Sequence, residues 1–235
     1  MTEKHSLVLV PGLLCTADLW RDQVSGLADI AHCMIGDHTH DDNIPDMARR
    51  ILAAAPKRFA LAGLSLGGYV VLEMMRQAPE RITHLAILDS RAIGDTTEER
   101  QKRLDFIKLV ERGSAFKGVT RSLLPILIHP SRLEDEDLVQ RIFKMAEDVG
   151  KEAFIRQERA LLAREDLSDM LQDIECPTMV LAGAEDRLIS PELQREMAIN
   201  IPTAQYVEIK DCGHLPTMEK PEETNDFLRR WLARH

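Results

Sequence analysis

The sequence predicts an α/β fold, with a six-stranded, mostly parallel sheet flanked by helices and an inserted helical cap. Apolar strand-like runs alternate with helical segments toward both ends of the chain, which is typical of a parallel sheet. The range 91–172 interrupts this alternation with charged, helix-like sequence that contains no strand-like run. A chain of 235 residues is long enough to bury one large core, so a single interrupted core is the simplest arrangement.

The strands are predicted from short apolar runs, several of them apolar on both faces, as in a sheet buried between two helix layers. They cover residues 6–10, 32–35, 59–64, 84–89, 177–183 and 205–209. The core helices are expected over 17–27, 44–54, 65–78, from 191 onward, and 221–233. Pro79 ends the third of these, and the order Ser190-Pro191 favours the start of the fourth.

The inserted block is expected to be helical throughout. Its helices are predicted near 96–112, 114–124, 135–149 and 151–164, with breaks at Gly113, Pro125, Pro130 and Gly150. The predicted domains are therefore a core of residues 1–90 and 173–235 and a cap of residues 91–172. Because parallel sheets bind ligands beyond the carboxyl ends of their strands, the cap is expected to cover that edge.

The composition excludes several classes of protein. The net charge of −9 argues against nucleic acid or an anionic membrane as a partner. No apolar run approaches the ~20 residues of a membrane span. The first five residues lead directly into a strand, which predicts no signal peptide and a cytoplasmic protein. The cysteines lack the paired spacing of a zinc site or a disulfide framework: Cys15, Cys33, Cys176 and Cys212.

The stretch Gly63-Leu64-Ser65-Leu66-Gly67 is the most informative motif in the chain. It follows an apolar strand and precedes a helix, which is the context of a nucleophile elbow. The sharp turn requires nearly side-chain-free neighbours, and Gly63 and Gly67 meet that requirement. The motif therefore predicts Ser65 as a nucleophile. The alternative is an ordinary glycine-rich turn whose serine only caps the helix.

A serine hydroxyl needs a base, and the base needs a third group to orient it. Asp186 follows the fifth predicted strand and His214 follows the sixth, so the chain order is serine, acid, histidine. We therefore expect Ser65, His214 and Asp186 to form a catalytic triad. Glu185 or Asp89 could orient the histidine instead, and His214 could be a loop residue without a role.

An oxyanion needs two backbone N–H donors aimed at one point. They are expected to be the amide of Leu66, just after the nucleophile, and that of Leu13, in the loop after the first strand. The cluster His38-Thr39-His40-Asp41-Asp42 resembles a set of metal ligands, since its two histidines are close, but no third cluster lies at recognisable ligand spacing. A solvated loop is the simpler account, so neither a metal nor a cofactor is predicted.

With these motifs the chain resembles the α/β-hydrolase superfamily, and within it the small capped carboxylesterases of the pimeloyl-carrier-protein methyl ester esterase type. The resemblance covers nearly the whole chain. The stretches that carry it are residues 11–20, which begin Pro11-Gly12-Leu13-Leu14, the elbow at 63–68, residues 183–191 and residues 211–221. It implies a core that lacks the first two strands of the family and a cap inserted after the fourth strand of this chain. One departure is Pro11-Gly12, where the family often has His-Gly.

The function expected from these features is hydrolysis of a small carboxylic ester through an acyl-enzyme, without a cofactor. The same machinery also serves lyases, carbon–carbon bond hydrolases and perhydrolases, and a non-catalytic ligand-binding protein is a further alternative. Arginines of the cap could dock an acyl carrier protein, or could form a solvated helical face: Arg100, Arg103, Arg156 and Arg159. Phenylalanines of the cap could line the pocket or fill the cap's own core: Phe106, Phe116, Phe143 and Phe154. The sequence does not indicate substrate identity or oligomeric state.

Overall fold

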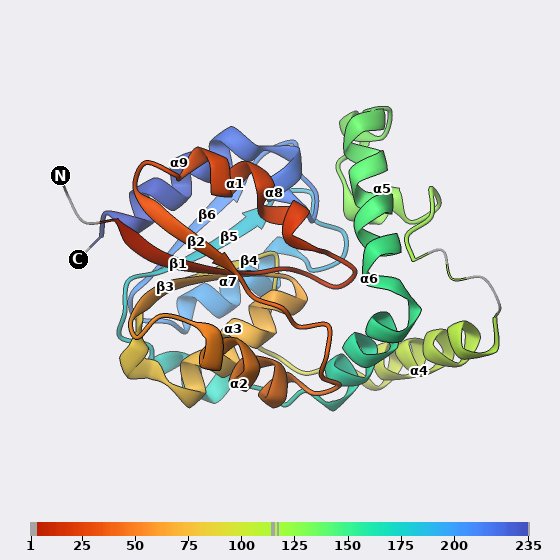
Figure 1. Ribbon diagram of the computed structural model, residues 1–235, viewed down its shortest axis with the longest axis horizontal. Helices are drawn as coiled ribbons and strands as arrows, with labels where there is room; N and C mark the ends of the chain where they lie inside the picture. The colour runs from red at the N-terminus through yellow and green to blue at the C-terminus, as the bar shows by residue number, and fades with distance from the viewer. Residues whose placement is uncertain (1–3, 114–115, 117, 235) are drawn as a thin grey trace.

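The computed structural model describes residues 4–113, 116 and 118–234. Its centre is a six-stranded sheet in which every strand pairs in parallel, in the order β2-β1-β3-β4-β5-β6 (Figure 1). The strands are β1 His5–Val10, β2 Ala31–Ile35, β3 Phe59–Leu64, β4 Ile82–Leu88, β5 Thr178–Gly183 and β6 Ala204–Ile209. The predicted parallel sheet is confirmed, and each strand lies within two residues of its predicted range.

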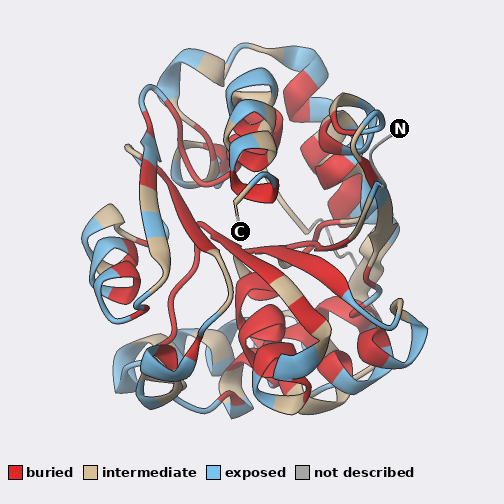
Figure 2. Cartoon of the chain, turned by 90° about the vertical axis from the view of Figure 1, so that its left-hand side faces the viewer, coloured by how far each residue is buried: buried red, intermediate tan, exposed pale blue. Residues whose placement is uncertain are grey.

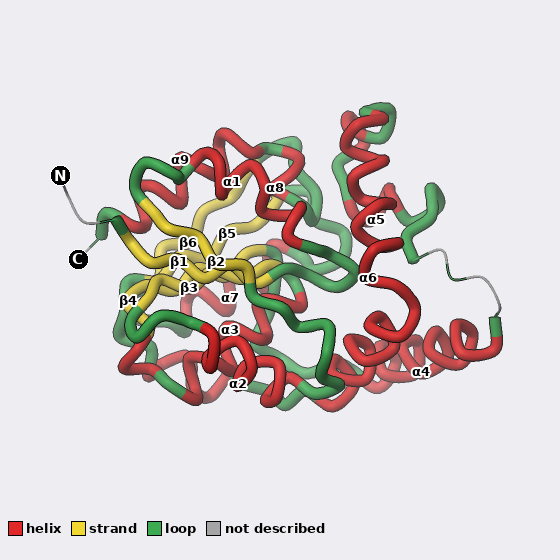
Figure 3. The backbone as a smooth tube through the Cα atoms, viewed as in Figure 1, coloured by secondary structure: helices red, strands yellow, loops and turns green. Residues whose placement is uncertain are grey.

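Two layers of helices enclose the sheet (Figure 3). One layer contains the short helix η1 (Ala17–Trp20), α1 (Arg21–Gly26), α8 (Pro216–Glu219) and α9 (Pro221–Leu232). The other contains α2 (Ile44–Ala54), α3 (Leu66–Gln77) and α7 (Pro191–Ile199).

Side chains of β1 alternate between these two layers, as the pleat of a strand requires. Leu7 and Leu9 join the apolar cluster that contains Trp20 and Trp231, on the α9 side. Val8 and Val10 join the cluster of α2 and α3 on the opposite face. The central strands are therefore buried on both faces, which explains their continuous apolar sequence (Figure 2).

Three helices of the inserted block lie beyond the carboxyl ends of the strands (Figure 1): α4 (Thr97–Arg112), α5 (Leu124–Leu127) and α6 (Glu136–Ala163). Thr96 and Glu99 form a reciprocal capping box that fixes the start of α4, and Gly113 ends it as predicted. Gly150 interrupts α6 with φ 75° and ψ 173°, so the predicted break occurs as a kink within one long helix. The exact boundaries of core and cap at residues 91 and 172 remain a prediction.

The predicted helix over residues 114–124 is wrong where it can be compared. Residues 114, 115 and 117 lie outside the described residues, while Phe116 and residues 118–123 are not helical. Gly118 has φ 58°, which is incompatible with a right-handed helix. Pro125 does not stop a helix here but lies in the first turn of α5, where its missing N–H costs no hydrogen bond.

Shorter 3₁₀ segments connect the larger elements: η2 (Pro79–Arg81), η3 (Pro130–Arg132) and η4 (Ser168–Asp173). All four cysteines are free thiols, and Cys15 and Cys212 are buried. Within the described ranges, no helix combines the length and the apolar character needed to cross a membrane.

Candidate active site

The order of the sheet places a crevice where the site was expected. The chain passes from β1 outward to β2 and then returns to β3 on the other side of β1. At such a switch point the loops after the two strands diverge and leave room for a ligand at their carboxyl ends. The loop of Gly12 and Leu13 leaves β1 at this point, and Ser65 leaves β3 beside it, where both loops line one cavity.

Ser65 has a strained backbone, with φ 56° and ψ −116°. Such a conformation costs a non-glycine residue roughly 1–3 kcal/mol and persists only where surrounding contacts impose it. Here the Ser65 amide donates to the carbonyl of Leu88 at 3.0 Å, and its carbonyl accepts from the amide of Gly68 at 2.8 Å. The Ser65 hydroxyl makes no hydrogen bond to any described residue, so it is free to react with a ligand.

Gly63 and Gly67 are required by close backbone contacts. A Cβ on Gly63 would lie 2.3 Å from the carbonyl oxygen of Gly67, and a Cβ on Gly67 would lie 2.2 Å from that of Val10. Both distances are far below any real contact, and the obstacle is backbone, which cannot rotate away. Neither position therefore has room for a side chain.

Gly67→Ala is expected to lower the free energy of unfolding by about 2–3 kcal/mol, because the new methyl group forces β1 and α3 apart. Gly94→Ala is the matched control, since a Cβ there would meet nothing within 4 Å. It should change stability by less than about 0.5 kcal/mol. Urea denaturation of both variants measures the difference, and equal stability would contradict the steric account.

His214 and Asp186 meet at the carboxyl edge of the sheet. Nδ1 of His214 lies 2.8 Å from Oδ2 of Asp186. The other carboxylate oxygen accepts from the amides of Leu188 at 2.8 Å and Ile189 at 3.1 Å, so the carboxylate is fixed on both sides. A carboxylate can only accept, so Nδ1 carries a proton, and in the neutral imidazole the lone pair is on Nε2. That Nε2 is buried and makes no hydrogen bond within the described chain.

The two alternative acids occupy different positions. Glu185 is exposed, and its carboxylate accepts from the amide of Cys212 at 3.0 Å instead of facing the histidine. Asp89 is fully buried. One of its carboxylate oxygens lies within 4.8 Å of a carboxylate oxygen of Asp186 and of a ring nitrogen of His214. Its Oδ1 accepts from the amide of Gly183 at 2.9 Å. Burial and, second, the nearby Asp186 carboxylate raise the pKa of Asp89 well above its usual range.

The two residues expected to supply oxyanion donors lie at the same cavity. Leu13 and Leu66 both line it, as do Ser65 and His214. The amide of Leu66 is at the first position of α3, where no preceding carbonyl of the helix can accept from it. Neither the Leu13 nor the Leu66 amide donates a hydrogen bond to a described residue. Stabilisation of an oxyanion would need two unpaired N–H groups, and these two residues line the same cavity as Ser65.

Two residues that support the site gave no signal in the sequence. Glu219 is buried, and its carboxylate accepts from the amides of Gly213 at 3.0 Å, Leu215 at 3.1 Å and His129 at 2.7 Å. It therefore fixes the backbone on both sides of His214 and joins it to the segment before η3. Nε2 of Gln194 donates to the carbonyl of Ile189 at 3.1 Å. The same nitrogen lies 3.4 Å from Oδ1 of Asp89 and 3.5 Å from Oδ2 of Asp186, at the edge of hydrogen-bonding distance. Such contacts depend on tertiary packing and have no local motif.

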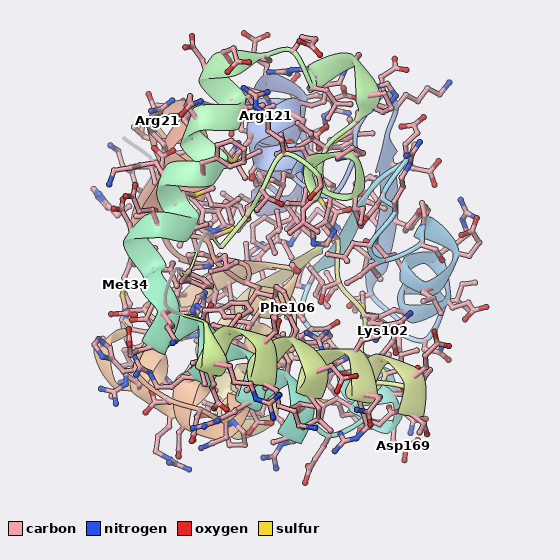
Figure 4. All side chains as sticks on the ribbon, turned by 90° about the vertical axis from the view of Figure 1, so that its right-hand side faces the viewer. Arg21, Met34, Lys102, Phe106, Arg121 and Asp169 are labelled. Atoms are coloured by element: carbon pink, nitrogen blue, oxygen red, sulfur yellow. The ribbon has the colours of Figure 1, made fainter. Side chains whose placement is uncertain are left out.

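A cavity of about 530 Å³ lies between the sheet edge and α4, α5 and α6, within the usual range for small-molecule sites. Figure 4 looks at this side of the molecule, with Phe106 and Lys102 labelled on α4. Phe106 and Phe154 line the cavity and pack edge to face, with their ring centroids 5.4 Å apart. The ring centroids of Phe116 and Phe154 are 5.2 Å apart, and Phe143 packs on an apolar cluster of the core. Both sequence-based alternatives for these phenylalanines are therefore realised.

The charged part of the cavity wall is paired internally. Arg91 contacts Asp95 at 3.0 Å and Glu99 at 2.9 Å, while Arg103 contacts Asp95 at 2.7 Å and Glu158 at 2.9 Å. Burial raises the pKa of Glu158, with the Arg103 charge opposing that effect. The remaining wall is formed mainly by Leu, Ile, Val and Phe side chains.

The histidine cluster after β2 makes contacts within the protein. His40 pairs with Asp37 at 3.1 Å, and Asp41 pairs with Arg50 at 2.6 Å. Among the described residues, no group able to hold a metal ion includes a member of the range 38–42.

The four arginines considered for carrier-protein docking all contact their own chain. Arg100 and Arg156 donate to the carbonyls of Leu162 and Thr39, and Arg159 pairs with Glu111. Arg103 pairs with the carboxylates described above. Docking of a carrier protein remains a prediction that no contact favours.

Comparison with known proteins places these features in a family. The sequence model of the "Alpha/beta hydrolase family" matches residues 7–227. A protein of Azorhizobium caulinodans named "Putative carbamate hydrolase RutD" is 25% identical over 239 residues, covering 94% of this chain and 89% of that protein. A 2-hydroxy-6-oxononadienedioate/2-hydroxy-6-oxononatrienedioate hydrolase of a Pseudomonas species is 24% identical over 182 residues, covering 76% of this chain and 64% of that protein.

A solved structure of a thermophilic esterase from Thermogutta terrifontis is also similar. It is 28% identical, covers 97% of this chain and 89% of its own, and superposes with a TM-score of 0.88. The particular likeness to pimeloyl-carrier-protein methyl ester esterases remains a prediction.

Proposed function

The chain belongs to the alpha/beta hydrolase family, and from that premise we propose that it hydrolyses small, uncharged carboxylic esters through an acyl-enzyme on Ser65. The observation that supports this most is the pairing of the His214 ring. Its Nδ1 is bonded to Asp186 at 2.8 Å, while its Nε2 is buried, unpaired and on the same cavity as Ser65. A base held in one tautomer beside a free hydroxyl has little purpose in a binding protein.

The proposed reaction has two halves. His214 Nε2 takes the proton of Ser65 as the serine oxygen attacks the ester carbonyl, and the amides of Leu13 and Leu66 stabilise the oxyanion. The tetrahedral intermediate then expels the alcohol, which receives the proton from His214. In the second half His214 takes a proton from water as the water oxygen attacks the acyl carbonyl, and it returns that proton to the Ser65 oxygen as the acid leaves. Asp186 stabilises the imidazolium in both halves.

The cavity wall supports an uncharged acyl group. Among the described residues, each Lys or Arg that lines it already pairs with a carboxylate: Arg91 with Asp95 and Glu99, Arg103 with Asp95 and Glu158, and Lys102 with Glu98. A carboxylate placed against Arg91 or Arg103 would have to displace one of their pairs, and a buried charge left without its partner is costly. Lys102 is 72% exposed, so water screens its charge and it would attract a carboxylate only weakly. Apolar side chains form most of the rest of the wall and suit an aliphatic or aromatic acyl chain.

An ester series tests this substrate class. We expect kcat/KM for p-nitrophenyl esters to rise with acyl length from two carbons until the cavity is filled. A neutral ester should exceed the ester of equal length that ends in a carboxylate by about tenfold or more, which corresponds to ~1.4 kcal/mol. Preference for the carboxylate-ended member would contradict the proposed substrate class.

Cleavage of a carbon–carbon bond is the second candidate, because one of the similar proteins is named for a dienedioate hydrolase activity. A burst of p-nitrophenol in rapid-mixing experiments separates the two. An acyl-enzyme that forms faster than it breaks down gives a burst equal to the enzyme concentration. Absent ester turnover together with consumption of a vinylogous 1,5-diketone would favour carbon–carbon cleavage.

A further inference from the structure

We propose that Gln157 and His38 are positioning residues that hold the loop Gly12-Leu13-Leu14 in the shape needed for oxyanion binding. The inference rests on the proposed function, since the Leu13 amide is an oxyanion donor only in that reaction. Neither side chain lines the cavity. Both are almost completely buried, at 0% and 1% exposed, directly behind the loop.

Three hydrogen bonds form a continuous bridge around this loop. The Leu14 amide donates to Oε1 of Gln157 at 3.2 Å, Nε2 of Gln157 lies 3.0 Å from Nδ1 of His38, and Nε2 of His38 lies 2.9 Å from the carbonyl oxygen of Pro11. The participants come from the loop after β1, the loop after β2 and helix α6. Segments more than a hundred residues apart in sequence are thus joined at one point.

The two ends of the bridge determine which atom donates and which accepts in each of its three hydrogen bonds. The Leu14 N–H can only donate, so the Gln157 atom that faces it is the oxygen. The amide nitrogen of Gln157 then faces Nδ1 of His38, which must accept and therefore has no proton. The proton is on Nε2, where it donates to the Pro11 carbonyl, which can only accept. Each of the three hydrogen bonds then has one donor and one acceptor when His38 is neutral. Burial lowers the pKa of His38, which favours this neutral form.

The loop needs this support because its backbone is unfavourable. Leu14 has φ 59°, in the left-handed region that residues with a side chain rarely adopt. The Cys15 amide closes the turn by donating to the Gly12 carbonyl at 3.1 Å. The bridge holds Pro11 before the turn and Leu14 after it, so the unpaired Leu13 amide lies between two anchored groups.

The bridge also joins the loop to the cap helix α6. Arg156 precedes Gln157 and donates to the Thr39 carbonyl at 2.8 Å, next to His38. Glu158 follows Gln157 and lines the cavity. One turn of α6 therefore contacts the oxyanion loop, the loop after β2 and the cavity wall.

Gln157→Leu removes both hydrogen bonds of the amide at nearly constant volume. Loss of one oxyanion donor costs about 10²–10³ in kcat, and a displaced donor costs part of that, so we expect kcat for a p-nitrophenyl ester to fall by roughly 10- to 100-fold. KM should change by less than about threefold, because the donor acts in the transition state rather than in substrate binding.

Gln157→Glu is the conservative variant that should retain most activity. One of its oxygens still accepts from Leu14, and the other shares a single proton with Nδ1 of His38. A role limited to filling space would predict the opposite order, since leucine suits a buried apolar site better than a carboxyl group. Gln140→Leu, on the exposed face of α6, and His40→Asn are matched controls that should leave kcat unchanged.

Hydrogen exchange of the Leu14 amide provides a readout independent of activity. Exchange should be slow in the wild type and in Gln157→Glu, and at least tenfold faster in Gln157→Leu. Turnover of the ester by wild type and its loss in Ser65→Ala would support the proposed function. If Gln157→Leu then matched wild type in kcat, the role of Gln157 and His38 would be overturned while the proposed function stands. If wild type shows no ester turnover, the proposed function fails, and unchanged Leu14 exchange in Gln157→Leu would then overturn the bridge as well.

Discussion

Ser65→Ala is expected to lower the turnover of a short-chain aryl ester by about 10⁴-fold or more, because it removes the atom that forms the acyl-enzyme. The proposed oxyanion donors and the apolar wall are unchanged, so binding of an uncharged substrate analogue should be unchanged too. Steady-state kinetics on purified wild type and variant measure the difference. Retention of more than about a hundredth of the activity would mean that Ser65 is not the nucleophile.

Ser65→Gly separates this loss of chemistry from any loss of structure. Glycine adopts the backbone angles of φ 56° and ψ −116° without the strain that a side chain adds, so this variant should be at least as stable as Ser65→Ala. Its activity should be equally low. If the glycine variant were both more stable and active, the serine would have a structural role only.

Asp186→Asn is expected to reduce kcat by about 10⁴-fold while leaving the fold intact. An amide nitrogen that replaces the carboxylate oxygen near His214 Nδ1 favours the wrong tautomer, with the proton on Nε2, where it cannot accept from Ser65. The carboxylate charge that stabilises the imidazolium is also lost. The ester assay, together with a denaturation curve, measures the two consequences separately.

Asp89→Asn and Glu185→Gln are the matched controls for that prediction. An asparagine at position 89 can still accept from the Gly183 amide, which is 2.9 Å from Oδ1 in the wild type. Glu185 faces the Cys212 amide and not the imidazole. Both variants should stay within about tenfold of wild type. A larger loss in Asp89→Asn than in Asp186→Asn would identify Asp89 as the acid that orients His214.

The sheet could be predicted from sequence because its signals are local. Central strands such as β3 are buried on both faces, so they are apolar without interruption, and the turn at Ser65 needs glycine on both sides for steric reasons. The positions of Ser65, Asp186 and His214 then follow from strand ends that share one edge. The helix predicted over 114–124 is wrong because a proline such as Pro125 can either end a helix or lie in its first turn. Only the conformation of the neighbouring backbone decides between the two.

The residues that support the site could not be predicted in the same way. His38 lies in a polar run that reads as a solvated loop, and Gln157 lies in an amphipathic helix with no motif around it. Their contact depends on how α6 packs over the loop after β1, and no local sequence pattern encodes that arrangement. Glu219 is similar, since its three amide donors come from two separate segments.

Mass spectrometry of the protein quenched in acid during turnover of a slowly deacylated ester detects the acyl-enzyme itself. We expect a mass increase equal to the acyl group, located on the peptide that contains Ser65 and absent from Ser65→Ala. Ester turnover with no such increase at any quench time, in a substrate that shows a burst, would contradict the acyl-enzyme, as would an acyl group found on another residue.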